Sequence, residues 1–313
     1  MPYRALGQCG VKVSTFALGG WTTFGGSVTD PKVIHQILHH AYGVGVNFFD
    51  MADIYAKGET EKVMGQVLKE FPRHTLVLSS KVFWPMSEDV NDRGLSRKHI
   101  MESVEKSLKR LGTDYLDLYF CHRYDEATPL EETVRAMDDL VHQGKVLYWG
   151  TSEWTAEQIT ASVELCKSRG YYRPKVEQPQ YSLVARNKVE PGVRQAVKAA
   201  GMGMVVWSPL GSGILTGKYD EGIPKGSRLD QIPWLREMVL TDGNIERVRQ
   251  FKTLAKEAGC SRAQLALAWV AAQPNVSSVI LGATQLTQLQ ENLGALNISM
   301  TQELASKIEA IFS

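Results

Sequence analysis

Short hydrophobic runs typical of buried strands alternate with helical segments along nearly all of the 313 residues of the chain. After a first strand that ends near Gly19, strand-like runs cover 46–50, 76–81, 115–121, 146–151, 174–178, 202–207 and 276–281. No GxGxxG fingerprint follows the first of them, which argues against a doubly wound sheet. Eight β units without a composition break instead predict an α/β fold, a (β/α)8 TIM barrel that occupies residues 1–313 as one domain.

Three segments stand outside this alternation. The stretch ALGQCGVKVSTF is expected to form an N-terminal β-hairpin that runs into the first strand. The stretches 82–95 and 210–242 are expected to be irregular, and loops of that length in a compact domain are usually functional. On a barrel they would overhang the rim formed by the carboxyl ends of the strands.

Ser261 and Gln264 match a capping box, which predicts that a helix begins directly after Ser261.

Composition excludes several classes of partner. The net charge of +1 gives no reason to expect nucleic acid or an anionic membrane surface. No apolar run reaches the ~18 residues of a membrane span, and the N-terminus lacks the apolar core of a signal peptide. Four scattered cysteines are expected to be free thiols in a reducing compartment, so we expect a cytoplasmic protein. His35, His39 and His40 share a helix, but zinc needs three or four converging ligands, so no metal site is expected.

Titratable groups end three of the predicted strands. Asp50 ends VNFFD, Lys81 ends LVLSSK, His122 ends DYLDLYFCH, and Tyr55 follows Asp50 by five residues. A parallel barrel brings such positions together at one rim. An ammonium lowers the pKa of a nearby phenol, so Lys81, oriented by Asp50, would prepare Tyr55 to protonate a carbonyl oxygen beside His122. Taken singly, Tyr55 is equally well a loop aromatic, and Lys81 a surface lysine.

The stretches FDMADIYAKGETEKVMG, LSSKVFW and YLDLYFCHRYD resemble the aldo-keto reductase family. Further stretches are similar to one branch of it, the β subunits of voltage-gated potassium channels and their relatives. These stretches are GGWTTFGG, DRGLSRKHI, TPLEETVRAMDDLV, YWGTSEW, WSPLGSGILTGKYDEGIP and SSVILGATQLTQLQEN. They appear in order from Gly19 to Asn292, so the resemblance covers nearly the whole chain.

No side chain can supply a hydride, so carbonyl reduction needs a carrier. The resemblance implies NADPH, extended across the carboxyl-end rim. It places the nicotinamide against Asp50, Ser152, Glu153, Gln178 and Trp207, although Trp207 at a strand end is also compatible with a core position. It places the pyrophosphate against Ser208, Leu210, Ser212 and Lys218, with Pro209 and Gly211 also in contact with the cofactor. Gly20, Trp21 and Thr22 would lie against the cofactor near the first strand. It places the adenosine end against Arg228, Gly282, Thr284, Gln288, Glu291 and Asn292, although Thr284 could simply cap the next helix.

Three positions depart from related patterns. Many family members carry a lysine and an arginine after the last strand, where this chain has GATQLTQLQEN, so the preference for NADPH over NADH stays open. The animal channel subunits often have asparagine at the position of His122, and this chain keeps the histidine of working reductases. They also tend to have arginine at the position of Glu153, beside the nicotinamide.

The resemblance implies an NADPH-dependent reductase of aldehydes, ketones or quinones, with Tyr55 as the general acid. Trp21, Tyr55, Trp84, His122 and Tyr124 would line the pocket of the carbonyl substrate, although the aromatic residues could also pack the loops on the barrel. The alternative is a redox-sensing accessory subunit that docks on a membrane channel and turns over slowly. The branch implies a homotetramer or a multiple of it, whereas ordinary family members are monomers.

Overall fold

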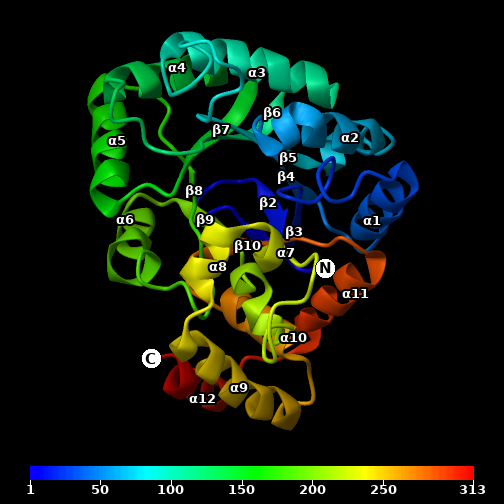
Figure 1. Cartoon of the computed structure of the whole chain (residues 1–313). Helices are drawn as coiled ribbons and strands as arrows, with labels where there is room; N and C mark the ends of the chain where they lie inside the picture. Colours follow the sequence, from blue (N-terminus) through cyan, green and yellow to red (C-terminus); the bar gives the residue numbers. More distant parts are fainter.

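The computed structural model describes residues 1–313 and contains eight parallel strands in a closed barrel (Figure 1). The barrel strands are β3 (Phe16–Gly19), β4 (Phe48–Asp50), β5 (Val77–Val82), β6 (Leu116–Cys121), β7 (Val146–Ser152), β8 (Val176–Gln178), β9 (Gly203–Val206) and β10 (Val276–Leu281). Each strand pairs with the next along the chain, and β10 closes the ring by pairing with β3. The predicted (β/α)8 barrel is therefore confirmed.

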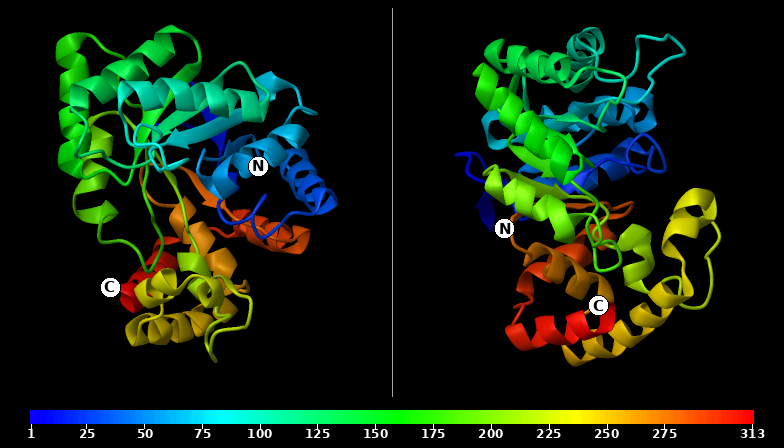
Figure 2. Two further views of the ribbon diagram at one scale, coloured as in Figure 1. Left: turned by 45° about the horizontal axis from the view of Figure 1, so that its top comes forward. Right: turned by 90° about the vertical axis from the view of Figure 1, so that its left-hand side faces the viewer.

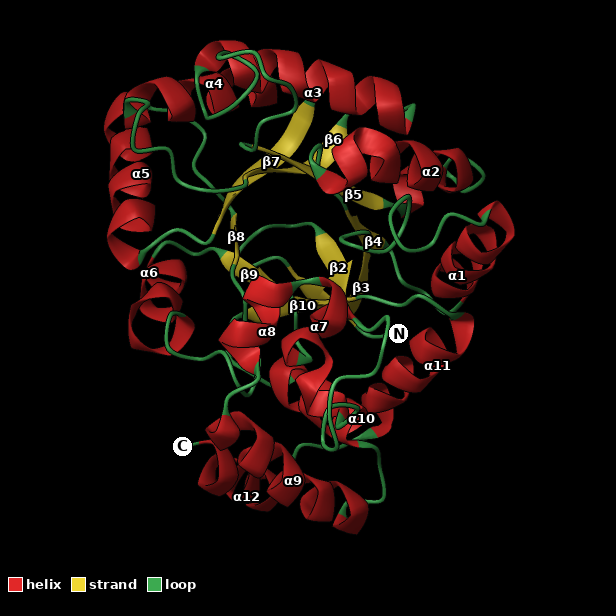
Figure 3. Ribbon diagram, viewed as in Figure 1, coloured by secondary structure: helices red, strands yellow, loops and turns green.

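Helices surround the ring of strands, as Figure 3 shows by colour. The helices are α1 (Pro31–Gly43), α2 (Glu59–Leu68), α3 (Arg97–Leu111), α4 (Leu130–His142), α5 (Ala156–Arg169), α6 (Arg194–Ala199), α7 (Arg228–Gln231), α8 (Pro233–Val239), α9 (Asp242–Glu257), α10 (Arg262–Ala271), α11 (Leu286–Leu293) and α12 (Gln302–Phe312). Short 3₁₀ helices are η1 (Tyr55–Gly58), η2 (Arg73–Thr75), η4 (Gly211–Thr216) and η5 (Gly294–Asn297), and η3 (Val189–Val193) is a short π-helix. None of these helices has both the length and the apolar composition needed to span a bilayer.

Side-chain caps fix where several helices begin. The Asp30 carboxylate accepts a hydrogen bond from the backbone N–H of Lys32 at 2.8 Å, and Pro31 then opens α1. The predicted capping box before α10 is present, because the side chains of Ser261 and Gln264 each accept from the other's backbone N–H. These local bonds satisfy N–H groups that a helix cannot satisfy by itself.

Two hydrophobic clusters divide the core. In β6, Leu118 and Phe120 belong to a cluster of ten residues, whereas the alternating Tyr119 and Cys121 belong to the large cluster that includes the helices. Successive side chains of a strand point to opposite faces, so the smaller cluster fills the barrel interior. The barrel is thus packed inside, and an open site can form only at an end.

A β-hairpin closes the amino-terminal end of the barrel. Strands β1 (Tyr3–Ala5) and β2 (Lys12–Ser14) pair antiparallel, which confirms the predicted N-terminal hairpin. Leu6 and Val13 of this region are fully buried and belong to the interior cluster. The right-hand view of Figure 2 shows the hairpin (dark blue) and α7–α8 (yellow) at opposite ends of the molecule. The site must therefore lie at the carboxyl-end rim, beneath α7 and α8.

The predicted irregular stretch 210–242 is only partly irregular. It contains η4, α7 and α8, and helix α9, which begins at Asp242, was not predicted at all. Helices of four to seven residues are too short to show an apolar periodicity. The stretch 82–95 has no helix, as predicted. The predicted strands 46–50 and 174–178 are shorter in the structure, because their first residues lie outside the strand pairing.

Candidate active site

The four titratable residues singled out in the sequence meet at the carboxyl-end rim. Asp50 ends β4, Lys81 lies near the end of β5, and His122 directly follows β6. Tyr55 begins the turn η1, whose next two residues have positive φ angles of 46° and 51°. This turn connects β4 to α2.

Lys81 is the centre of the hydrogen-bond network. Its Nζ donates to Asp50 Oδ2 at 2.7 Å, to the Met51 carbonyl at 2.7 Å and to the Tyr55 hydroxyl at 3.1 Å. The other oxygen of Asp50 accepts from Ser79 at 2.7 Å and from Gln178 at 3.0 Å. The Lys81 side chain is fully buried, so these bonds hold its ammonium in a single position.

Burial and charge act in opposite directions on this group. Burial raises the pKa of the Tyr55 hydroxyl, and the Lys81 ammonium lowers that pKa but does not outweigh burial. The net direction therefore differs from the expectation that the lysine lowers it. Burial also opposes the charge of Lys81, but Asp50 and Tyr55 together raise the pKa of Lys81 above its ordinary value. The resting state has a charged lysine beside a protonated tyrosine.

His122 is neutral in this setting. Its burial, together with the nearby charges of Lys81 and Arg123, lowers the pKa of the imidazole well below its usual value. Its ring lies edge-on to Tyr55, with 5.8 Å between ring centroids. The buried Nδ1 atom has no hydrogen-bond partner within the protein.

A cavity of about 920 Å³ extends from these residues along the rim. At one end it is lined by Asp50, Tyr55 and His122, and at the other by Arg228 and Asn292. Most residues predicted to contact a cofactor line it: Trp21, Thr22, Ser152, Gln178, Trp207, Ser208, Pro209, Leu210, Ser212, Lys218, Arg228, Gly282, Thr284, Gln288, Glu291 and Asn292. Its volume suits a ligand of dinucleotide size.

Five of the predicted residues do not line the cavity. Lys81 lies behind the Asp50 and Tyr55 side chains, to which it donates. Gly20 packs against α2, since a Cβ atom there would overlap the Thr60 side chain. Gly211, likewise, is packed against Val184.

Tyr124 was expected in the substrate pocket, but it lies outside the cavity. Its ring packs edge-on against Trp154 at a centroid distance of 4.8 Å. Trp84 does line the cavity and is 37% exposed, with its ring edge-on to His122. The pocket wall near Tyr55 is thus formed by Trp84 from the loop after β5 and by His122 and Arg123, which directly follow β6, but not by Tyr124.

Glu153 is hydrogen-bonded to the Trp207 side chain. The Trp207 indole N–H donates to Glu153 Oε1 at 3.1 Å, and Lys188 pairs with Oε2 of the same carboxylate at 3.0 Å. Trp207 lines the cavity and meets Trp21 edge-to-face at 5.5 Å. Glu153 itself does not line the cavity, and its carboxylate also accepts a hydrogen bond from the Gln180 N–H.

The backbone is strained where three strands end. Thr22 after β3, Glu153 after β7 and Ser208 after β9 have φ angles of 58°, 61° and 53°. Non-glycine residues in this region cost on the order of 1 kcal/mol or more, and such residues concentrate at functional sites. All three of these strands end at the carboxyl-end rim.

Unpaired polar groups collect along the far part of the cavity. The buried hydroxyls of Thr22, Ser212 and Ser227 make no hydrogen bond. Lys218 and Arg228 line the same part of the cavity without an acidic partner, and burial lowers the pKa of Arg228. Unpaired buried donors and cations fit the pyrophosphate and phosphate groups of a nicotinamide dinucleotide.

Several lining residues were not identified from the sequence. They include Arg123, Ser227, Gln231 and Trp234, and three of these lie on or directly before α7 and α8. Trp234 is 55% exposed although it is a large aromatic residue. The only signal in the sequence was the length of the stretch 210–242, which indicated a functional loop but not which of its side chains face the site.

The chain belongs to the aldo/keto reductase family, whose model matches residues 15–312. This is a class of NAD(P)H-dependent oxidoreductases that act on carbonyl groups, so the family predicted from the motifs is confirmed. The barrel, the rim cavity and the Asp50, Tyr55, Lys81 and His122 cluster are in keeping with that class.

Within the family, the chain is similar to channel β subunits. It is 46% identical over 318 residues to the probable voltage-gated potassium channel subunit beta of Oryza sativa subsp. japonica, and equally to that of Arabidopsis thaliana. In both comparisons the match covers 99% of this chain and 96% of the relative. It is 41% identical over 322 residues to a putative subunit of the same kind from Schizosaccharomyces pombe, covering 100% and 94%. The predicted branch is thus confirmed as well.

Proposed function

We propose that the protein is an NADPH-dependent reductase of aldehydes, ketones or quinones, in which Tyr55 is the general acid. The observation that carries this proposal is the chain of hydrogen bonds from Asp50 through Lys81 to the Tyr55 hydroxyl at one end of the cavity. In this proposal residues 1–313 act as a single barrel domain in the cytoplasm.

The remaining cavity residues support the choice of cofactor. Lys218 and Ser212 would hold the pyrophosphate, and Arg228 would hold the 2′-phosphate that distinguishes NADPH from NADH. Ser152 and Gln178 would orient the nicotinamide amide, and Trp207 would stack on the ring. When bound, the cofactor supplies the hydride that no side chain can supply.

The residues around the carbonyl group would protonate its oxygen and stabilise the charge that develops there. Tyr55 donates its hydroxyl proton to the carbonyl oxygen as the carbonyl carbon is reduced to an alcohol carbon. The Lys81 ammonium stabilises the phenolate that remains, and Asp50 keeps that ammonium charged and in place. The neutral His122 orients the carbonyl oxygen, and water then returns a proton to Tyr55.

The test is a matched pair of tyrosine substitutions. Tyr55→Phe should lower kcat for NADPH oxidation with aromatic aldehydes by about 10²–10⁴-fold, the usual contribution of a general acid. NADPH binding, followed by fluorescence titration, should change little. Tyr124→Phe removes a hydroxyl from a ring outside the cavity and should leave both quantities unchanged. Equal activity of Tyr55→Phe and the parent would refute the assignment.

The names of the relatives favour a second candidate, an accessory channel subunit with slow turnover. In that case the protein would assemble as a tetramer and dock on a membrane channel. Single-turnover and steady-state rates with the same aldehyde distinguish the two candidates. A reductase completes many turnovers, whereas an accessory subunit oxidises its bound NADPH once and releases NADP⁺ slowly.

A further inference from the structure

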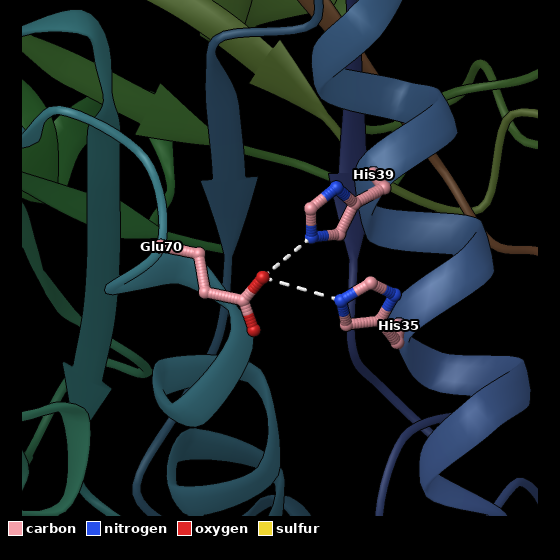
Figure 4. Close-up of side chains that lie close together, drawn as sticks. All are labelled: His35, His39 and Glu70. Carbon is pink, nitrogen blue, oxygen red and sulfur yellow. Dashed lines mark hydrogen bonds and ion pairs between the residues drawn. The ribbon is translucent and has the colours of Figure 1, made fainter.

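Two histidines and a glutamate converge on the outer surface, away from the cavity (Figure 4). His35 and His39 lie one turn apart on α1, and Glu70 follows the end of α2. The Nε2 atoms of both imidazoles lie close to the same carboxylate oxygen, Oε2 of Glu70, at 3.2 Å and 2.8 Å. All three ligand atoms lie within 4.8 Å of one another.

The spacing of these atoms is close to that in a metal site. Zinc binds imidazole nitrogen and carboxylate oxygen at about 2.0–2.2 Å, so two ligands of a tetrahedral site lie roughly 3.3 Å apart. The nitrogen–oxygen separation is 3.2 Å for His35, close to this value, and 2.8 Å for His39, which is shorter by about 0.5 Å. The rings stack with 3.8 Å between centroids and an interplanar angle of 22°, so their Nε2 atoms point the same way, as Figure 4 shows. Small rotations of the side chains would place all three atoms around one ion.

Neighbouring aromatic residues hold the two helices in this position. Phe71 directly follows Glu70, stacks on Tyr42 of α1 at 4.0 Å and contacts the His39 ring at 4.7 Å. The Tyr42 hydroxyl is hydrogen-bonded to Thr75 at 3.1 Å. These contacts fix the register between α1 and the chain after α2. Support of this kind around the ligands is what keeps a metal site ordered before the ion binds.

We propose that His35, His39 and Glu70 form a binding site for a divalent late-transition-metal ion of the zinc class. Two imidazoles and one carboxylate suit Zn²⁺, Ni²⁺ or Cu²⁺, whereas Mg²⁺ and Ca²⁺ prefer oxygen ligands alone. The side chains are 48%, 38% and 47% exposed. Water can therefore complete the coordination, and the ion can reach the site from solvent. A bound ion would link α1 to the end of α2.

The sequence could not reveal the third ligand of this site. His35, His39 and His40 share one helix, and that helix offers no further ligand that converges with them. Glu70 is 31 residues from His39 and reaches the pair only because α1 and α2 pack side by side around the barrel. The expectation that no metal binds was thus based on an incomplete ligand set, and the proposal replaces it.

Calorimetric titration of the metal-free protein with ZnCl₂ tests the proposal. We expect one site per chain and a rise in the melting temperature with Zn²⁺, because an ion that binds only the folded state stabilises it. His39→Ala should weaken this binding by at least about ten-fold, and Glu70→Gln, which keeps the shape of the side chain, should weaken it by about the same factor. MgCl₂ should give neither effect.

A matched control uses another histidine–carboxylate pair. His142 lies 3.4 Å from Asp138 on α4 and is 70% exposed, but no second histidine joins it. His142→Ala should leave Zn²⁺ affinity unchanged. The half-buried thiols of Cys9 and Cys260 are the other accessible soft ligands. Zn²⁺ binding that disappears in Cys9→Ser or Cys260→Ser but persists in His39→Ala would overturn the proposal.

The paramagnetic resonance spectrum of one equivalent of Cu²⁺ gives a second, independent readout. We expect nitrogen hyperfine splitting from two imidazoles in the parent protein and from one in His35→Ala. These side chains are partly exposed, so the variants should fold, and circular dichroism checks this. A spectrum without imidazole nitrogen, or one that is identical in both proteins, would refute the site.

Discussion

A single buried ammonium links the charged residues of the candidate active site. Lys81 is fully buried, and its partner Asp50 is only 4% exposed. A buried charge without a partner is very costly, whereas a paired charge that makes several hydrogen bonds is tolerated. The three bonds of Lys81 therefore explain how a lysine can lie inside the barrel mouth.

This pairing predicts a distinctive pattern of stability. Lys81→Met or Asp50→Asn alone should lower the free energy of unfolding by roughly 3–5 kcal/mol, because each leaves the partner charge or its donors unpaired. The double variant should regain part of this loss but none of the turnover. Urea unfolding and NADPH oxidation, measured on all four proteins, check the two outcomes separately. Additive losses in the double variant would show that the two residues are not coupled.

At the scale of elements, strands β7 and β8 bring a carboxylic acid into the core. Thr151 and Glu177 are opposite each other in the pairing, and the threonine hydroxyl donates to the carboxylate. Burial raises the pKa of Glu177 from 4.5 to about 8. The folded state thus keeps a proton that the unfolded chain releases between these two pH values. Its contribution to stability is complete below pH 4.5 and is lost as the pH rises to about 8.

Replacement of this acid should flatten the dependence of stability on pH. Between pH 5.5 and 8.0 the parent protein should lose up to about 3 kcal/mol more than Glu177→Gln, at about 1.4 kcal/mol per pKa unit. Urea unfolding of both proteins at the two pH values measures this difference. Glu164→Gln, an exposed position on α5, is the control and should behave like the parent. If Glu177→Gln keeps the full dependence on pH, Glu177 titrates normally in the folded protein.

For the molecule as a whole, the hairpin at the amino-terminal end completes the packed interior. Leu6 is fully buried, and together with Val13 it joins the cluster formed by barrel residues such as Phe48 and Leu118. The hairpin is joined to the barrel by a hydrogen bond from the Gly7 N–H to Ser277, at the start of β10. It therefore belongs to the folded core rather than to the surface.

A substitution in the hairpin should accordingly affect the entire molecule. Leu6→Ala should lower the free energy of unfolding by roughly 2–5 kcal/mol, the cost of a cavity in a packed core. Leu147→Ala makes the same chemical change at a position that is 40% exposed, and it should cost about 1 kcal/mol or less. Denaturant unfolding of the two variants gives the comparison. Similar losses in both would mean that the hairpin does not share in the core.

The sequence alone determined the barrel and the hairpin, because strand and helix periodicities are local signals. It determined the family through the resemblance of whole stretches such as FDMADIYAKGETEKVMG to known members. It also predicted that Asp50, Tyr55, Lys81 and His122 lie together, as they do in the structure, since each stands at or shortly after a strand end, where a parallel barrel forms its site. Only the tertiary structure decided that Tyr124 packs on Trp154 outside the cavity, that burial outweighs Lys81 at Tyr55, and that Glu70 meets His35 and His39. Each of these depends on contacts between segments distant in sequence, which no local pattern encodes.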